Sequence, residues 1–183
     1  GIFGGGTAVI RTADGHATVI DGLSTAPHAC TPETFTPVAD TWPDYMEAEG
    51  RENSVGYRAV AVPGNLQAWC EILDEFGTLP LATVMGAAIR HAEQGFTVTP
   101  YLSACIEEKA ADLALDPEIS ALFLRDGKPL PAGSRLVQAD YAATLKSIAA
   151  AGPEVLYTGA LGRQIGAAFA AAGGYITADD LAR

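Results

Sequence analysis

The sequence predicts an α+β fold. Three short runs, at residues 7–11, 17–21 and 58–62, have the β-branched composition that is typical of strands. After residue 64, apolar residues recur every three or four positions, which is the spacing of helices that bury one face. Three short strands make a sheet that is too small to be stable alone, so we expect the sheet to be completed by a partner chain.

The first two strands form a predicted hairpin. The runs at 7–11 and 17–21 flank Asp14-Gly15, and an Asp-Gly pair between two such runs is a strong signal for a tight turn. The preceding glycines at 4–6 lead into a strand and lack the Lys-Ser/Thr of a phosphate-binding loop. We interpret them as a place where the backbone packs closely against a neighbouring element.

The stretch from 57 to 96 carries the clearest pattern in the chain. Its strand at 58–62 is expected to stop at Pro63-Gly64, because proline cannot continue a hydrogen-bond ladder and glycine tolerates a sharp turn. Apolar residues then recur at helical spacing as far as Gly77. A second helix, rich in small residues, is expected to begin after Pro80 and to end near Gly95.

The segment 22–56 is predicted to be a long acidic loop. Loops of this length in a compact protein are usually functional or mobile, and the pattern leaves open whether this one walls a site or is a solvated connection. Thr177 is the expected N-cap of a helix near the end of the sequence. Further helices are predicted at 101–115, 120–124, 139–151 and 159–172.

Charge and composition exclude some classes of partner. The 183 residues include 22 Asp and Glu against 11 Lys and Arg, which gives a net charge of −11. Nucleic acids and anionic membranes bind basic surfaces, so neither is expected as a partner. Cys30, Cys70 and Cys105 are odd in number and form no C-x-x-C, which indicates neither a disulfide framework nor a zinc site. Cys70 and Cys105 are expected to pack in the core.

No set of residues in this chain makes a complete active site by itself. His16, His28 and His91 are far apart in the sequence and none lies in an H-E-x-x-H motif, so neither a metal nor another cofactor is expected. A Ser-His-Asp triad stays open, although no G-x-S-x-G elbow is present. We interpret the carboxylate pairs Asp74-Glu75 and Asp179-Asp180 as helix surfaces.

Several longer motifs follow one another along nearly the whole chain. The stretch 56–96 contains G-x-x-A-V-A-V-P-G, then a helix that ends in F-G-x-L-P, then a helix that ends in A-x-x-G-F. The stretch 173–182 reads G-G-x-I-T-x-x-D-L-A. In this order the motifs resemble the gamma-glutamyltranspeptidase family and, more closely, its cephalosporin acylase branch. Other segments that carry the resemblance are 20–27, 51–53, 69–71, 98–103 and 136–159.

The resemblance implies an N-terminal nucleophile hydrolase with a four-layer αββα sandwich fold. Proteins of this family are made as one precursor that cuts itself into two chains. The new N-terminal threonine of the second chain attacks an amide, with its own α-amine as the base. Because this chain begins with Gly1, it is expected to be the first chain, with no catalytic residue of its own. Residues 1–183 are accordingly expected to form a single incomplete domain, a fragment of the alpha subunit.

The same resemblance singles out Leu23. Gamma-glutamyltranspeptidases carry an arginine at this position, within the motif I-D-x-R-E-x-A-P. That arginine binds the α-carboxylate of the glutamyl group, and a leucine here removes its bidentate donor. The acylase branch also has leucine and serine here, which favours a glutaryl or another aliphatic acyl group. Ser24 and Thr25 either donate hydrogen bonds to the acyl group or cap a turn. Arg51 and Arg58 are the alternative sources of a cation.

The sequence therefore predicts hydrolysis of, or acyl transfer from, a small-molecule acyl amide through a threonine acyl-enzyme. The nucleophile is expected from a partner chain, the beta subunit of the same precursor. Two alternatives stay open: a true gamma-glutamyltransferase or glutathione hydrolase that uses another cation, and an inactive relative that serves as a binding or structural protein. The sequence does not decide between the bacterial periplasm and the cytoplasm.

Overall fold

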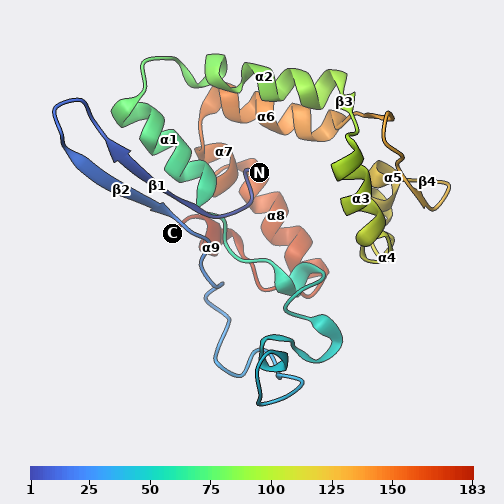
Figure 1. Ribbon diagram of the computed structural model, residues 1–183. Helices are drawn as coiled ribbons and strands as arrows, with labels where there is room; N and C mark the ends of the chain where they lie inside the picture. Colours follow the sequence, from blue (N-terminus) through green and yellow to red (C-terminus); the bar gives the residue numbers. More distant parts are fainter. The chain divides into compact units, whose positions relative to one another are not determined.

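The computed structural model describes residues 1–183, which form two compact units (Figure 1). The first unit comprises Gly1–Leu79 and Ala151–Arg183, and the second comprises Pro80–Ala150. Both contain helices and short strands, which confirms the predicted α+β class. No helix is both long and apolar enough to cross a membrane.

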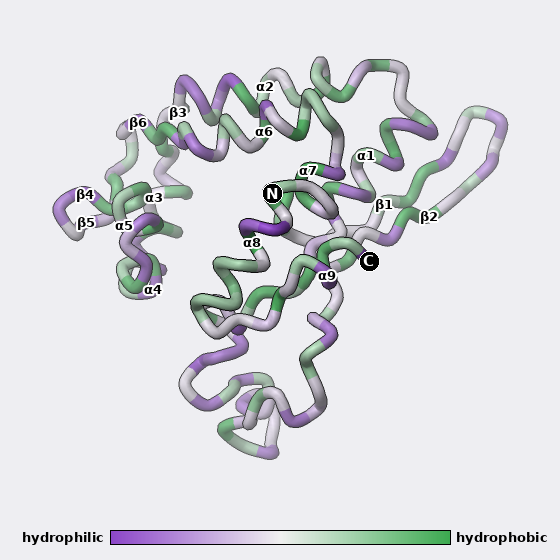
Figure 2. Tube along the Cα trace, turned by 180° about the vertical axis from the view of Figure 1, so that it is seen from behind, coloured by the Kyte–Doolittle hydropathy of each residue, from purple (hydrophilic) through white to green (hydrophobic).

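The first unit begins with the predicted hairpin. Strand β1 (Gly6–Arg11) pairs antiparallel with β2 (Ala17–Gly22), and Val9 lies directly opposite Val19. At the turn, Gly15 has a φ of +93°, a conformation that glycine adopts without strain. Figure 2 colours stretches of both strands as hydrophobic and the turn between them as hydrophilic.

Helix α1 (Asn65–Phe76) ends before Gly77, as the sequence predicts, and it packs against β2 (Figure 1). The contact is close because glycines lie on both sides of it. A Cβ atom on Gly22 would come within 2.5 Å of the Cβ of Ala68, and one on Gly64 within 2.7 Å of two backbone oxygens. Within the glycine run at 4–6, Gly5 makes a similarly close approach, since a Cβ on Gly5 would come within 2.5 Å of the amide nitrogen of Ser24.

The predicted strand at 58–62 is wrong. Tyr57–Ala59 forms a short 3-10 helix, and only Val62 makes a β-bridge, with Thr25. The two residues exchange backbone hydrogen bonds of 3.1 and 2.8 Å. A strand requires hydrogen-bond partners along its length, and this apolar run has a neighbouring backbone at one residue alone.

Three helices complete the first unit: α7 (Glu154–Tyr157), α8 (Ala160–Ala171) and α9 (Ala178–Leu181). The sequence predicts α8 and the Thr177 cap of α9, but it does not predict α7. One buried cluster of the unit consists of Val62, Phe169, Ile176 and Leu181. Phe169 also contacts the aromatic rings of Phe3 and Tyr57.

The long segment that follows β2 contains only short 3-10 helices, at Asp44–Met46 and Glu49–Arg51, as expected for a loop. Besides the bridge between Thr25 and Val62 and the hydrogen bond from the N–H of His28 to Asp180, it returns to the body of the unit at two further places. The ring of Phe35 packs edge-on against Tyr175. Arg58 donates hydrogen bonds to Tyr175 and Glu52, which ties the end of the loop to the segment after α8.

The second unit is mainly helical. The predicted helix at 101–115 breaks at Lys109 into α3 and α4, while the helices predicted after Pro80 and at 139–151 are confirmed. One buried cluster of this unit consists of Val98, Ile106, Leu124, Leu130 and Leu136. Its elements are α2 (Leu81–Gln94), β3 (Phe96–Thr97), α3 (Pro100–Glu108), α4 (Ala110–Leu113), α5 (Pro117–Phe123), β4 (Leu124–Arg125), β5 (Lys128–Pro129), β6 (Arg135–Leu136) and α6 (Ala139–Ala151).

Candidate functional site

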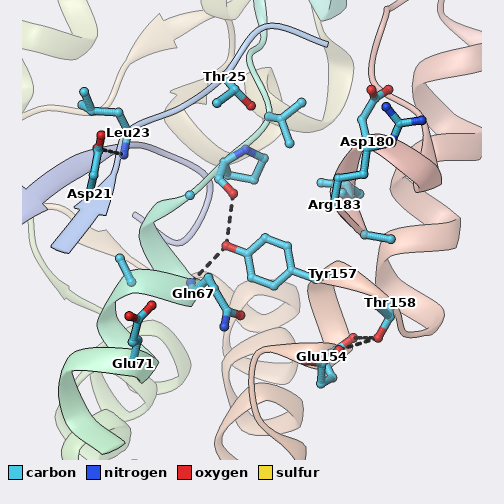
Figure 3. A pocket seen from close by; sticks show the side chains of 16 residues that line it. Asp21, Leu23, Thr25, Gln67, Glu71, Glu154, Tyr157, Thr158, Asp180 and Arg183 are labelled. Carbon is cyan, nitrogen blue, oxygen red and sulfur yellow. Dashed lines mark hydrogen bonds between the residues drawn. The ribbon is translucent and has the colours of Figure 1, made fainter. Parts of the chain in front are cut away.

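A cavity of about 570 Å³ opens in the first unit, between the end of β2, the first turns of α1, and helices α7 and α9 (Figure 3). Its lining comes from four segments that are far apart in the sequence, within residues 21–25, 62–71, 154–158 and 180–183. Two of the three residues that the sequence singles out, Leu23 and Thr25, are part of this lining.

The segment 21–25 forms one wall of the cavity. The Oδ1 atom of Asp21 accepts a hydrogen bond of 3.0 Å from the backbone N–H of Leu23, and Thr25 is held by its bridge to Val62. Leu23 is 58% exposed, so the wall presents an apolar group that is largely open to solvent. Ser24 is not part of the lining; its hydroxyl lies beside the backbone of Gly5.

Tyr157 joins two walls of the cavity. Its hydroxyl donates a hydrogen bond of 3.1 Å to the carbonyl oxygen of Pro63 and accepts one of 3.1 Å from the N–H of Gln67 (Figure 3). Gln67 lies in the first turn of α1, where backbone N–H groups have no partner within the helix and where Gly64 supplies no capping side chain. Burial raises the pKa of the Tyr157 hydroxyl above its usual value. The tyrosine therefore caps α1 from a distant helix.

Replacing Tyr157 with phenylalanine is expected to lower the free energy of unfolding by about 1–2 kcal/mol, because the change leaves a backbone donor and a backbone acceptor without partners. Chemical denaturation measures this loss. The matched control is Tyr101→Phe, since Tyr101 is 80% exposed and its hydroxyl makes no hydrogen bond in the structure. Equal stability of the two variants would contradict the capping role of Tyr157.

Asp180 occupies a place that the sequence does not predict. The interpretation of Asp179-Asp180 as a helix surface is wrong for Asp180, which is only 9% exposed. Its carboxylate accepts hydrogen bonds from the N–H of His28 (2.8 Å) and from both the N–H (2.9 Å) and the hydroxyl (2.6 Å) of Thr177. Burial alone would raise the pKa of Asp180, but the hydrogen bonds from Thr177 and His28 and the charge of Arg183 together hold it below its usual value.

The charges around the cavity are mostly negative. The lining contains Asp21, Glu71, Glu154 and Asp180 against one cation, Arg183. Neither Arg51 nor Arg58, the two cations that the sequence offers, is part of the lining. Arg58 instead binds Glu52 and lies over the ring of Tyr175, with 5.1 Å between its guanidinium carbon and the ring centroid.

The cavity is equipped for binding rather than for bond cleavage. Its lining includes no cysteine, serine or histidine, and its only hydroxyls belong to Thr25, Tyr157 and Thr158. Two of these are engaged, since Tyr157 caps α1 and Thr158 donates a hydrogen bond to Glu154. No group of three or more His, Cys, Asp or Glu side chains in the chain could hold a metal ion. Thr25 is the remaining hydroxyl in the lining.

Comparison with known proteins places these features in one family. The Gamma-glutamyltranspeptidase family profile matches residues 1–183. The chain is 55% identical over 182 residues to Acylase ACY 1 proenzyme of a Pseudomonas species, and 33% identical over 180 residues to the glutathione hydrolase proenzyme of Escherichia coli. The alignments cover 100% and 98% of this chain but only 33% and 30% of those relatives, so the chain spans about a third of their length.

Solved structures agree with the sequence comparison. The gamma-glutamyltranspeptidase of Helicobacter pylori superposes with a TM-score of 0.90 at 27% identity, over 99% of this chain and 50% of that chain. The cephalosporin acylase of Bacillus halodurans superposes with a TM-score of 0.83 at 29% identity, over 100% of this chain and 33% of that chain. Fold and sequence thus point to one group of amide hydrolases and transpeptidases. The chain belongs to the gamma-glutamyltranspeptidase family.

Proposed function

We propose that this chain is the non-nucleophilic part of an N-terminal threonine amidohydrolase or acyltransferase that acts on glutaryl or similar aliphatic acyl amides. Two facts support the enzyme class: the family membership, and the 55% identity to a protein named as an acylase proenzyme. In this proposal the nucleophile is a threonine supplied by a partner chain cut from the same precursor, with its own α-amine as the base.

The observation that carries the substrate class is the exposed Leu23 on the cavity wall. An arginine at this position would offer a bidentate, permanently charged donor to a substrate carboxylate, whereas leucine offers only apolar surface. Arg58, one of the two cations that the sequence offers as a replacement, is engaged with Glu52 and Tyr175. The wall at Leu23 and Thr25 therefore suits the methylene part of an acyl chain, with Thr25 as a hydrogen-bond donor.

A second candidate is a true gamma-glutamyltransferase or glutathione hydrolase, and the charges of the cavity favour it. Arg183 is a cation in the lining, and Glu71 is an exposed carboxylate in the same lining. Such a pair is complementary to the α-carboxylate and α-ammonium groups of a glutamyl head. In this alternative Arg183 takes over the role that an arginine at position 23 has elsewhere in the family.

We further propose that residues 1–183 are one incomplete domain of the αββα sandwich and that the partner chain packs on the hairpin. The hairpin is a two-stranded sheet with both outer edges unpaired. Its outward face carries Val9 and Val19, which are 77% and 59% exposed and lie opposite each other. Burying this face and pairing its edges would remove apolar surface and unsatisfied backbone groups from water.

Three amides of one chromogenic amine test the substrate proposal on the intact protein. Glutaryl and gamma-glutamyl groups share a terminal carboxylate and differ in the α-amine, whereas a pentanoyl group of the same length has neither. We expect the glutaryl and pentanoyl amides to be hydrolysed with kcat/KM values within a few-fold of each other. Both values should be at least about 10-fold higher than that of the gamma-glutamyl amide, because burying its ammonium group without a partner costs more than about 1.4 kcal/mol.

The possible outcomes separate the candidates. A preference for the gamma-glutamyl amide would replace the acylase proposal with the glutathione hydrolase alternative. No hydrolysis of any of the three amides would favour the inactive relative. In the same experiment, N-terminal sequencing of the second chain must find threonine, and any other residue there would overturn the proposed nucleophile.

A further inference from the structure

The cavity wall is fixed at two points. At one end, the bridge between Thr25 and Val62 holds it beside the entry to α1. At the other end, the backbone N–H of His28 donates a hydrogen bond to Asp180, which lies 152 positions away in the sequence. Leu23, Ser24 and Thr25 are exposed, so packing does little to restrain the wall itself.

The second point is the more vulnerable of the two. From residue 26 to residue 34, every other hydrogen bond is local, such as those from Cys30 to Pro27 and from Thr34 to Thr31. The bond from His28 to Asp180 is the only one in this stretch that reaches another part of the unit. Its loss would leave the segment after Thr25 attached only by the burial of Pro27 and by contacts beyond residue 34.

The carboxylate of Asp180 divides its two oxygens between two tasks. Oδ1 accepts the bond from His28, while Oδ2 accepts both bonds from Thr177 at the start of α9. Three donors thus converge on one carboxylate, and an ionised carboxylate acts only as an acceptor of hydrogen bonds. An amide at this position would turn one acceptor into a donor, so at least one of the three bonds would be lost.

We infer that Asp180 is a positioning residue for substrate selection: through the backbone of His28 it sets the place of the wall at Leu23–Thr25, and thereby which acyl groups fit the cavity. Asp180 acts through the wall and not on the bond that is cleaved. The inference rests on the proposed function for its substrate class. It concerns selectivity among acyl groups, so its signature is a change in the ratio of rates and not a general loss of activity.

Two substitutions at His28 test the hydrogen bond, since one removes the backbone donor and the other keeps it; proline also fixes φ, so Asp180→Asn serves as the second test of the same bond. His28→Pro removes the side chain and the N–H, whereas His28→Ala removes the side chain and keeps the N–H. Asp180→Asn weakens the same bond from the other side, and Thr177→Val removes the hydroxyl that caps α9 while leaving the bond to His28 in place. All four variants are made in the intact protein.

The first readout is the ratio of kcat/KM for the pentanoyl amide to that for the acetyl amide of the same amine. This ratio does not depend on the fraction of active protein. We expect at least a fivefold change in His28→Pro and in Asp180→Asn, and values within twofold of wild type in His28→Ala and Thr177→Val. The second readout is the rate of backbone hydrogen exchange at residues 24–30. We expect exchange to be about 10-fold faster than in the wild type in His28→Pro and Asp180→Asn, but not in His28→Ala or Thr177→Val.

Each outcome decides one question. Faster exchange with an unchanged ratio would make Asp180 a purely structural residue and would overturn the inference. Equal behaviour of His28→Pro and His28→Ala in both readouts would do the same. If the wild-type protein hydrolyses neither these two amides nor the glutaryl amide, the proposed function fails and the selectivity claim fails with it, while the exchange comparison still decides whether Asp180 holds the wall. If Asp180→Asn does not mature, the pair at His28 gives the answer alone.

Discussion

Replacing Leu23 with arginine is expected to raise kcat/KM for amides whose acyl group ends in a carboxylate, relative to the neutral pentanoyl amide, by roughly 10- to 100-fold. The physical reason is the charge-assisted hydrogen bond, which contributes about 1.5–3 kcal/mol when one group is ionised. Leu23 is 58% exposed and lies on the cavity wall, so the longer side chain has room and its charge stays hydrated until the substrate binds.

The comparison of three amides makes this prediction specific. Both the glutaryl and the gamma-glutamyl amide carry the carboxylate, so the kcat/KM of each, relative to that of the pentanoyl amide, should be higher in Leu23→Arg than in the wild type. Leu23→Gln is the matched control, because glutamine is long and polar but has no charge, and its ratios should stay near those of the wild type. If Leu23→Arg leaves all ratios unchanged, position 23 does not face the acyl group, and the substrate proposal loses the observation that carries it.

Local patterns predicted those elements that local interactions build. The hairpin follows from Asp14-Gly15 between two strand-forming runs, and α1 follows from its apolar spacing and from Gly77. The pattern T-x-x-D at Thr177 is the signature of a capping box, and the structure contains that box. In each case the residues that determine the element lie within a few positions of one another.

Elements that depend on distant partners were missed. The run at 58–62 has the composition of a strand, but a strand exists only where another backbone supplies hydrogen bonds, and only Val62 has such a neighbour here. Asp180 looks like a surface carboxylate in a helix of four residues, yet the N–H of His28 makes it a buried acceptor. Sequence spacing cannot reveal a partner that lies 152 positions away.

The candidate site was predicted in part for the same reason. The resemblance to a family directed attention to Leu23 and Thr25, and the structure brings both to one cavity. The opposite walls come from α7 and α9, and nothing in the local pattern connects Tyr157 or Arg183 with residue 23. A signal did exist for Asp180, another residue of these walls. The capping box predicts that Asp180 accepts hydrogen bonds at the start of α9, although it does not predict the hydrogen bond from His28.

Replacing Gly64 with alanine is expected to lower the free energy of unfolding by about 1–3 kcal/mol, through steric overpacking. The backbone angles of Gly64, φ −101° and ψ −14°, suit alanine, so conformational strain is not the cause. The added Cβ would lie 2.7 Å from the carbonyl oxygens of both Gly22 and Leu23, which are backbone atoms that cannot rotate away. Thermal unfolding measures the loss.

The catalytic effect of Gly64→Ala should exceed what its stability loss alone would cause, because the two oxygens belong to the wall that carries Leu23. Relief of the clash moves this wall by several tenths of an ångström or more, and a displacement of about 1 Å in a site can reduce the rate on the order of 100-fold. Gly4→Ala is the matched control, since its Cβ would come no closer than 3.6 Å to any atom outside the adjacent residues, which is an ordinary contact. If both variants retain wild-type kcat/KM on the preferred amide, the wall is not where the acyl group binds. A loss confined to Gly64→Ala would tie the close contact between β2 and α1 directly to substrate binding.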